Sequence, residues 1–333
     1  MTNLVAYGWD DALAARVGDL DQLDGRVGRV IRVERGECDV ITGEEIERVA
    51  SDSLRAQDDL APVTGDWVVV GDDPDTGPVI DRIIERDHVL ARRDPAERDA
   101  EQVLVANIDA VLIVHGLDRP LPPGRLERYL VVAWDSDTEP VVVLTKSDIH
   151  DAERTSALIE AIAPGVRQIC VDSIGGQGLD EVAAFIGVGR TIALLGESGA
   201  GKSTLVNALA GEERQEIGEV RSGDSKGRHT TVTRDLVLLP TGALIVDTPG
   251  IRAVGLWEAE EALHRVFDDV EELSESCRFG DCRHGAEPDC AVTGALDPAR
   301  IERYAALRDE LERQRDRQVA RERKPKGRPG RRR

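Results

Sequence analysis

Aromatic residues are scarce in this sequence, with three Phe, three Tyr and four Trp among 333 residues. Its cores must therefore be mainly aliphatic, since apolar residues still make up 41% of the chain. No stretch of 18 apolar residues occurs, and the opening "MTNLVAYGWDDALAARVG" lacks a basic segment followed by an apolar one. The sequence thus predicts no membrane span and no signal peptide, and we expect a cytoplasmic monomer of two or three domains.

Basic residues are also in short supply over most of the chain. There are 43 Lys and Arg against 64 Asp and Glu, a net charge of −21, which excludes a surface that binds nucleic acid over its whole area. Residues 313–333 reverse the balance, with eleven basic and two acidic side chains. The end "RERKPKGRPGRRR" is either a disordered solubilising tail or an arm that binds polyanions such as RNA, and charge alone leaves both open.

The chain has five cysteines: Cys38, Cys170, Cys277, Cys282 and Cys290. An odd number, with three inside fourteen residues, indicates a metal cluster in a reducing compartment and not a disulfide framework. "CRFGDCRHGAEPDC" has the spacing C-x4-C-x-H-x5-C. The candidate zinc ligands are Cys277, Cys282, His284 and Cys290. Four protein ligands leave no open position, so the predicted Zn²⁺ is structural; the alternative is free thiols beside a surface histidine.

The pattern of apolar, β-branched and turn-forming residues changes along the chain and indicates several domains. Residues 1–20 are either a loosely fixed leader or a short helix around "DDALAARVG". Residues 20–95 contain short β-branched runs separated by Gly, Asp and Pro, which suits a small closed barrel of the OB or SH3 kind, and we favour the OB type.

Residues 99–256 alternate apolar strands with helical patterns, which predicts a mainly parallel α/β sheet covered on both faces. Residues 257–312 form a predicted small helical domain that contains the Cys cluster, with a helix pattern over "DPARIERYAALRDELERQRDRQ". Residues 313–333 are the basic tail, expected to be disordered.

A phosphate-binding loop stands at "GESGAGKST", which fits G-x-x-x-x-G-K-[ST]. Its glycines let successive N–H groups and the next helix N-terminus face phosphate oxygens. We expect Lys202 to reach the β- and γ-phosphates and Ser203 to bind Mg²⁺. The predicted contact residues are Gly196, Glu197, Ser198, Gly199, Ala200, Gly201, Lys202, Ser203 and Thr204. The motif alone does not separate ATP from GTP.

A second phosphate element is "LIVDTPG", where Asp247 can hold Mg²⁺ through water and Gly250 can turn its N–H toward the γ-phosphate. The next residue, Ile251, stands where many GTPases have a glutamine that positions water. The isoleucine side chain forms no hydrogen bond, so we expect slow intrinsic hydrolysis, with an outside partner or another residue completing the site.

Between the two phosphate elements lies "EVRSGDSKGRHTTVTRD", a polar segment typical of a loop ordered by γ-phosphate and Mg²⁺. Thr230 or Thr231 can complete the Mg²⁺ shell, and we favour Thr231. His229 is either a solvated loop histidine or a group that orients water for hydrolysis.

A guanine-binding loop is predicted at "TKSD", residues 145–148, after an apolar strand. Asp148 can accept hydrogen bonds from the guanine ring N–H and amino group, which adenine does not offer together, while Lys146 can cover the base. Thr145 stands where Asn is usual and lacks the amide that would bridge base and phosphate loop, so we expect modest guanine affinity; Ser147 completes the loop. Ser173 in "VDSIGGQGLD" is the candidate residue of a base-closing loop.

The order of these motifs is that of a GTPase cut open elsewhere, because the guanine reader precedes the phosphate loop. This order, together with "GRHTT", "DTPG", the Cys/His spacing and the β-rich leader domain, resembles the ribosome small-subunit-dependent GTPases (RsgA) over residues 25 to 310. The resemblance implies an OB-fold, a circularly permuted GTPase domain and a zinc domain. It also implies GTP hydrolysis stimulated by the small ribosomal subunit late in maturation, with contacts to rRNA.

Three rivals stay open at this point: a P-loop ATPase, an RNA-binding adaptor whose nucleotide site is vestigial, and a permuted GTPase of the large subunit. The intact Lys202, Ser203 and Asp247 argue against the adaptor, and the zinc cluster and β-rich domain argue against the third. We also expect GTP to order the segment around Arg228 and the segment after Gly250, which leads directly into the zinc domain.

Overall fold

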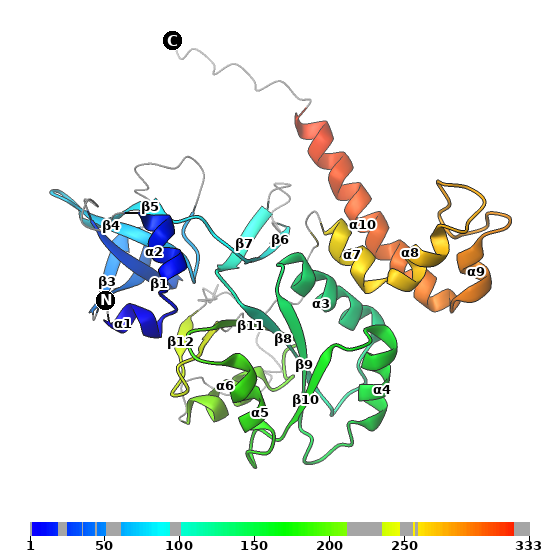
Figure 1. The fold of residues 1–333 in the computed structure, drawn as a ribbon, viewed down its shortest axis with the longest axis horizontal. Helices are drawn as coiled ribbons and strands as arrows, with labels where there is room; N and C mark the ends of the chain where they lie inside the picture. Colours follow the sequence, from blue (N-terminus) through cyan, green and yellow to red (C-terminus); the bar gives the residue numbers. More distant parts are fainter. Residues whose placement is uncertain are drawn as a thin grey trace, which may run out of the picture.

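A computed structural model gives the fold of the chain, and it describes residues 2–18, 25–34, 36–43, 45–50, 61–93, 101–211, 235–246, 256 and 259–322. Three parts follow one another in space as in sequence (Figure 1). An N-terminal barrel is joined to a central α/β unit, and a group of C-terminal helices packs on the far side of that unit.

The barrel is closed and has the strand order β1-β2-β3-β5-β4. Its strands are β1 (Arg26–Glu34), β2 (Glu37–Thr42), β3 (Glu45–Ala50), β4 (Trp67–Asp73) and β5 (Gly77–Ile83). Valines such as Val30, Val49 and Val70 fill the interior, as the scarcity of aromatic residues predicts. This topology confirms the OB-type barrel.

The leader is packed against the barrel. Helices α1 (Thr2–Ala6) and α2 (Asp11–Val17) contact it through Trp9, whose ring lies edge-on to Trp67 with 5.2 Å between centroids. Asp10 caps α2 by accepting a hydrogen bond from the Leu13 N–H. Of the two alternatives for residues 1–20, the short helix is therefore the one that forms, and aromatic packing fixes it.

A buried arginine joins leader, barrel and central unit. Arg29 is 2% exposed, donates to the backbone carbonyls of Tyr7 and Asn107, and donates to the Thr191 hydroxyl at 2.8 Å. Its guanidinium also lies over the Trp67 ring, 5.1 Å from the centroid. Burial lowers the pKa of Arg29 to about 10, so the side chain still carries its proton at neutral pH.

Strand β6 (Val89–Arg93) leaves the barrel and pairs antiparallel with β7 (Glu101–Ala106). The barrel strands themselves end at Ile83, so residues 89–93 of the expected barrel region belong to this separate hairpin. The domain boundaries at residues 95, 99 and 256 stay predictions.

The central unit is a six-stranded sheet with the order β10-β9-β8-β11-β13-β12. Its strands are β8 (Ala110–Gly116), β9 (Glu139–Thr145), β10 (Arg167–Val171), β11 (Thr191–Leu195), β12 (Leu236–Leu238) and β13 (Leu244–Val246). All neighbours are parallel except β12 and β13. Its helices are α3 (Pro123–Asp135), α4 (Glu153–Ile162), α5 (Leu179–Ile186) and α6 (Lys202–Ala210).

Alternate residues of the sheet enter two different cores. Val111 and Ile113 face a core that includes α3 and α4, whereas Leu112 and Val114 face a core that includes α5 and α6. Both faces of the central strands are thus buried, which explains their uninterrupted apolar runs and confirms the predicted parallel α/β fold.

The C-terminal part consists of α7 (Glu260–Val266), α8 (Asp268–Ser274), α9 (Ala291–Ala295) and the long α10 (Pro298–Glu322). The helix predicted over residues 297–318 is confirmed and continues to Glu322, so the disorder that was also expected from residue 313 is wrong for residues 313–322. Strong helix formers continue the pattern here, and Gln314 remains buried at 3% exposure. Residues 323–333 lie outside the described residues.

Helix α10 is attached to α3 by buried charge. Glu127 of α3 is 0% exposed and accepts hydrogen bonds from Arg300 at 2.8 Å and Arg303 at 2.7 Å. A second pair joins Arg128 to Glu310 at 2.6 Å. A fully buried carboxylate requires such partners, so these arginines fix the position of α10 on the central unit.

Among the helices of the described residues, none combines the length and the apolar character that crossing a membrane requires.

Replacement of Glu127 by alanine should loosen α10, because Arg300 would lose a buried counter-charge. We expect hydrogen-exchange protection in α10 to fall by about 3–5 kcal/mol. The matched control is Glu181→Ala, whose pair with Arg167 is about half exposed and should be worth less than about 1 kcal/mol. Equal protection of α10 in both variants would contradict this account.

Candidate functional site

The carboxyl ends of four parallel strands meet at one edge of the central sheet. Gly116 pairs with Thr145, Thr145 pairs with Val171, and Leu195 pairs with Ile113. The loops that follow β9, β10 and β11 are "TKSD", "VDSIGGQG" and the phosphate loop. The reordered motifs of the sequence therefore come together, as expected for ligand sites in such folds.

The phosphate loop runs from Gly196 to Gly201 and opens α6. A Cβ at Gly196 would overlap the Val114 carbonyl, and one at Gly201, whose φ is 93°, would lie 2.9 Å from the Thr145 hydroxyl. Only glycine allows both approaches. Within the described residues no side-chain cap hydrogen bond forms at the α6 N-terminus, and a helix N-terminus that follows a glycine-rich loop is a favourable position for an anion.

Lys202 folds back over this loop. Its Nζ donates to the Gly196 carbonyl at 2.7 Å and to the Glu197 carbonyl at 2.8 Å. Ser203 and Thr204 stand in the first turn of α6 and are half-buried. The ammonium group is therefore held at the mouth of the loop, where an entering phosphate can offer it stronger acceptors.

Thr145 contacts the phosphate loop directly. Its hydroxyl is buried and donates to the Ala200 carbonyl at 2.6 Å. The usual asparagine at this position would contact both the base and the phosphate loop through its amide. The Thr145 hydroxyl makes the contact with the phosphate loop. The sequence did not reveal this contact, because it depends on β9 and β11 lying either side of β8.

Lys146 lies across the same loop in a left-handed conformation, with φ 63°. Its Nζ donates to the Gly199 carbonyl at 3.1 Å and pairs with Asp118 at 2.9 Å. Hydrogen bonds from Arg119, and then from Lys146, lower the pKa of Asp118 to about 2, so it stays charged at neutral pH. Asp148 is exposed two residues further on, where its carboxylate is open to a ligand.

The predicted base-closing loop is a tight turn after β10. The Asp172 side chain accepts from the N–H groups of Ile174 and Gly175, and the Ser147 N–H donates to the Val171 carbonyl at 3.3 Å. The Ser173 hydroxyl is buried and forms no hydrogen bond within the described residues. This unpaired hydroxyl follows β10, the neighbour of the strand that ends in "TKSD", and is suited to a polar ligand atom.

Two residues that sequence reasoning missed border the phosphate loop from the α3 side. Arg125 pairs with Glu197 at 2.6 Å. His115 is 4% exposed, its Nε2 lies 3.0 Å from the Arg119 carbonyl, and burial lowers its pKa. The available clue was position alone, because "DAVLIVHGL" is a central strand whose carboxyl end must reach the ligand edge.

Several predicted residues lie outside the described residues: Arg228, His229, Thr230, Thr231, Asp247, Gly250 and Ile251. The strand before Asp247, β13, runs parallel to β11, with Val246 opposite Ala193. The roles assigned to these residues remain predictions.

The Cys and His side chains of the C-terminal part converge. The ligand atoms of Cys277, Cys282, His284 and Cys290 all lie within 4.8 Å of one another. The Sγ atoms of Cys277 and Cys290 are 3.8 Å apart. This matches the edge of a tetrahedron with Zn–S bonds of about 2.3 Å, which is about 3.8 Å. The residues therefore fit one Zn²⁺ with no open position, and Cys290 directly precedes α9.

Substitution of one ligand should empty this site. We expect purified chain to hold about one zinc, and Cys290→Ser to hold almost none and to unfold at lower temperature. Cys170→Ser is the matched control, because Cys170 is an exposed thiol outside the cluster. Metal analysis measures the zinc content, and thermal unfolding measures the stability, of both variants. Unchanged zinc content in Cys290→Ser would rule out this ligand set.

Comparison with known proteins agrees with this geometry. The family model described as RsgA GTPase matches residues 83–257. A Streptomyces avermitilis protein named small ribosomal subunit biogenesis GTPase RsgA is 44% identical over 304 residues, covering 90% of this chain and 81% of the relative. Its namesake in Streptomyces coelicolor is 42% identical and covers 93% of this chain and 87% of the relative.

Solved structures match as well. The crystal structure of YjeQ from Thermotoga maritima has a TM-score of 0.60 at 27% identity, covering 86% of this chain and 98% of that one. YloQ, titled a circularly permuted GTPase, has a TM-score of 0.58 and covers 93% and 99% of the two chains; at 23% identity it supports the fold alone. By its sequence, its fold and its arrangement of loops, this chain belongs to the RsgA GTPase family.

Proposed function

We propose that this protein binds GTP and hydrolyses it in late maturation of the small ribosomal subunit, in contact with the subunit and its rRNA. One observation supports the proposal: the three loops that we assign to guanine reading, base closure and phosphate binding share one edge of the sheet in a chain of this family. The name of the Streptomyces relatives supports the ribosomal part. The same work implies a cytoplasmic location, and we expect the protein to act as a monomer.

The guanine base would be read by Asp148 and enclosed by Lys146 and Ser173. A carboxylate that accepts two hydrogen bonds from guanine would remain unpaired with adenine, which favours GTP over ATP. The Thr145 hydroxyl links the base-reading loop to the phosphate loop, so both ends of the nucleotide site have one rigid frame. Ser147 extends the frame to β10 through its backbone bond to Val171.

The phosphates would lie in the cradle of residues 196–204 with Lys202 at the β- and γ-positions. Ser203, with Thr231 and Asp247 as further candidates, would hold Mg²⁺, which neutralises the charge that develops on the phosphate oxygens. Since Ile251 cannot orient a water molecule, hydrolysis needs a group from the ribosomal subunit or another residue such as His229.

Helix α3 offers a route from the nucleotide to the zinc domain. Arg125 pairs with Glu197 of the phosphate loop, and two residues later Glu127 holds Arg300 of α10. Both contacts are made by one rigid helix, so movement of the phosphate loop would displace α3 and with it α10. We therefore assign α3 a part in this coupling, beside the segment after Gly250 named on sequence grounds.

The alternative is a nucleotide-gated adaptor that binds RNA and hydrolyses little GTP. The substitution of Ile251 for a water-positioning side chain favours it. Turnover measurements separate the two functions.

Purified chain should hydrolyse GTP slowly alone and on the order of tenfold or more faster with small ribosomal subunits, since activating groups supplied in trans raise such rates strongly. ATP and large subunits serve as controls, and Lys202→Ala should abolish the stimulated rate. GTP binding without turnover in every mixture would favour the adaptor. ATP turnover at the same rate would contradict the guanine assignment.

The Thr145 bridge makes a second, independent test. Thr145→Val keeps the shape and removes the bond to Ala200, so we expect GDP affinity to fall about fivefold to tenfold, the net value of one hydrogen bond. Thr138→Val is the matched control, because that buried threonine bonds to Ala133 away from the site. Fluorescent-nucleotide titration measures both; equal affinities would show that the bridge serves folding alone.

A further inference from the structure

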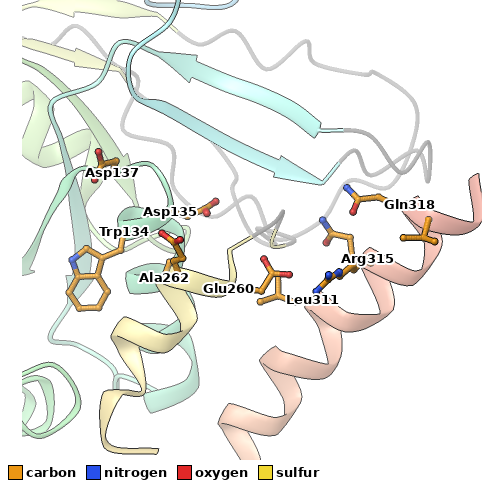
Figure 2. Close-up of a pocket in the computed structure, with 11 residues that line it drawn as sticks. Trp134, Asp135, Asp137, Glu260, Ala262, Leu311, Arg315 and Gln318 are labelled. Carbon is orange, nitrogen blue, oxygen red and sulfur yellow. The ribbon is translucent and has the colours of Figure 1, made fainter. Parts of the chain in front are cut away.

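A pocket of about 840 Å³ lies where the end of α3, the start of α7 and the second half of α10 come together. Figure 2 shows Asp135 and Asp137 from the α3 end, Glu260 from α7, and Arg315 and Gln318 from α10 around it. It is separate from the nucleotide edge and from the zinc cluster, and neither of those sites explains it.

The lining of the pocket is acidic. Among the described residues that line it, Asp135, Asp137, Glu260 and Glu261 are carboxylates and Arg315 is the one cation. Within the described part of the chain, Asp137, Glu260 and Glu261 take part in no ion pair. Asp137 also stands just beyond the C-terminal end of α3, where the helix dipole disfavours acidic side chains. A local arrangement that opposes the dipole calls for a compensating positive charge.

A buried amide in the same wall also lacks a partner. Gln314 lines the pocket and is 3% exposed, and its Nε2 forms no hydrogen bond within the described residues. Such an unpaired buried donor destabilises the fold unless an acceptor reaches it. The pocket thus offers carboxylates for cations and one N–H donor for a carbonyl, which are the complementary groups of a basic peptide.

The chain itself carries such a peptide directly after the pocket. Residues 323–333, "RKPKGRPGRRR", contain seven Lys/Arg and no acidic side chain. Eleven extended residues reach about 35 Å, whereas the pocket wall on α10, from Leu311 to Val319, is about 12 Å long. Pro325 and Pro329 favour an extended backbone whose carbonyls have no internal partners, and "PG" favours a turn.

We propose that this pocket is the docking site of the chain's own basic C-terminal segment, residues 323–333. Its Lys and Arg side chains pair with Asp137, Glu260 and Glu261, and one backbone carbonyl accepts from Gln314. The short connection from α10 gives the segment a high effective concentration at the pocket. While docked, its cations are neutralised, so a polyanion such as RNA must displace the segment from the pocket before binding to it.

The chain contains five lysines, Lys146, Lys202, Lys226, Lys324 and Lys326, which makes a direct test practical. A water-soluble carbodiimide joins lysine amines to carboxylates only at ion-pair distance. We expect full-length protein to yield Lys324 or Lys326 linked to Asp137, Glu260 or Glu261, as identified by mass spectrometry. The yield should fall several-fold at high salt, because half-exposed pairs are screened.

The variant Asp137→Asn/Glu260→Gln/Glu261→Gln should lose the cross-links between the tail lysines and the pocket. The total yield of cross-links from Lys324 and Lys326 should also fall, because other acids should not take their place. Its control is Glu275→Gln/Asp281→Asn/Glu302→Gln, which removes three exposed acids of the same domain and should leave the pocket products unchanged. Gln314→Leu should reduce the yield without lowering thermal stability, because an unpaired buried amide is replaced by an apolar group.

An equal mixture of ¹⁵N-labelled and unlabelled chains identifies the occupant. Products within one isotope class support docking of the chain's own segment. Products of mixed mass would show that a second copy supplies the tail and would overturn the intramolecular proposal. Tail products spread over acids across the whole surface, with the same yield in both triple variants, would overturn the pocket as a site.

Discussion

In the central sheet, β10, β9, β8 and β11 run parallel and in register, so that Val171, Thr145 and Gly116 lie abreast at one edge with Leu195 close by. Everything that points to nucleotide chemistry depends on this register. The loops that start at that edge are far apart and out of the usual order in sequence. A hydrogen bond across the edge, from Thr145 to Ala200, then holds the "TKSD" loop against the phosphate loop.

The register also explains why a chain cut open at a different point keeps its site. Strands pair with their spatial neighbours whatever their order along the chain, and the new termini of the unit lead to the barrel on one side and to the zinc domain on the other (Figure 1). Arg29 secures the first junction at Thr191, the first residue of the strand that leads into the phosphate loop. The buried Glu127 secures the second.

Different sides of helix α3 contact different parts of the molecule. Its apolar side packs on the sheet through residues such as Leu126 and Leu130, while Arg125 reaches the phosphate loop and Glu127 reaches α10. Its C-terminal end contributes acidic side chains to the pocket beside α10. One helix therefore contacts the phosphate loop, the zinc-domain helix and the pocket that we assign to the basic segment.

Much of this architecture could be predicted because it rests on local patterns. Apolar runs that end in polar turns predicted β8, β9, β10, β11 and β13, and the glycines of "GESGAGKST" predicted a loop wrapped around an anion. The spacing of Cys277 to Cys290 predicted a tetrahedral set that the fold brings together. The leader helices were open on sequence alone, since the packing of Trp9 on Trp67 is a contact between distant segments.

The sequence predicted a helix as far as Gln318 from its pattern and disorder from residue 313 from its charge. The burial of Leu311 and Gln314 against other elements favours the helix, which continues to Glu322. Short sequence separations thus determined the motifs, the zinc ligand set and the order of secondary structure, because those depend on steric and chemical preferences of neighbouring residues. Tertiary structure alone decided that Arg125 pairs with Glu197, that Thr145 bonds to Ala200, and that three helices line an acidic pocket. Each of these contacts joins residues that are distant in sequence, and only the packing of the sheet and helices brings them together.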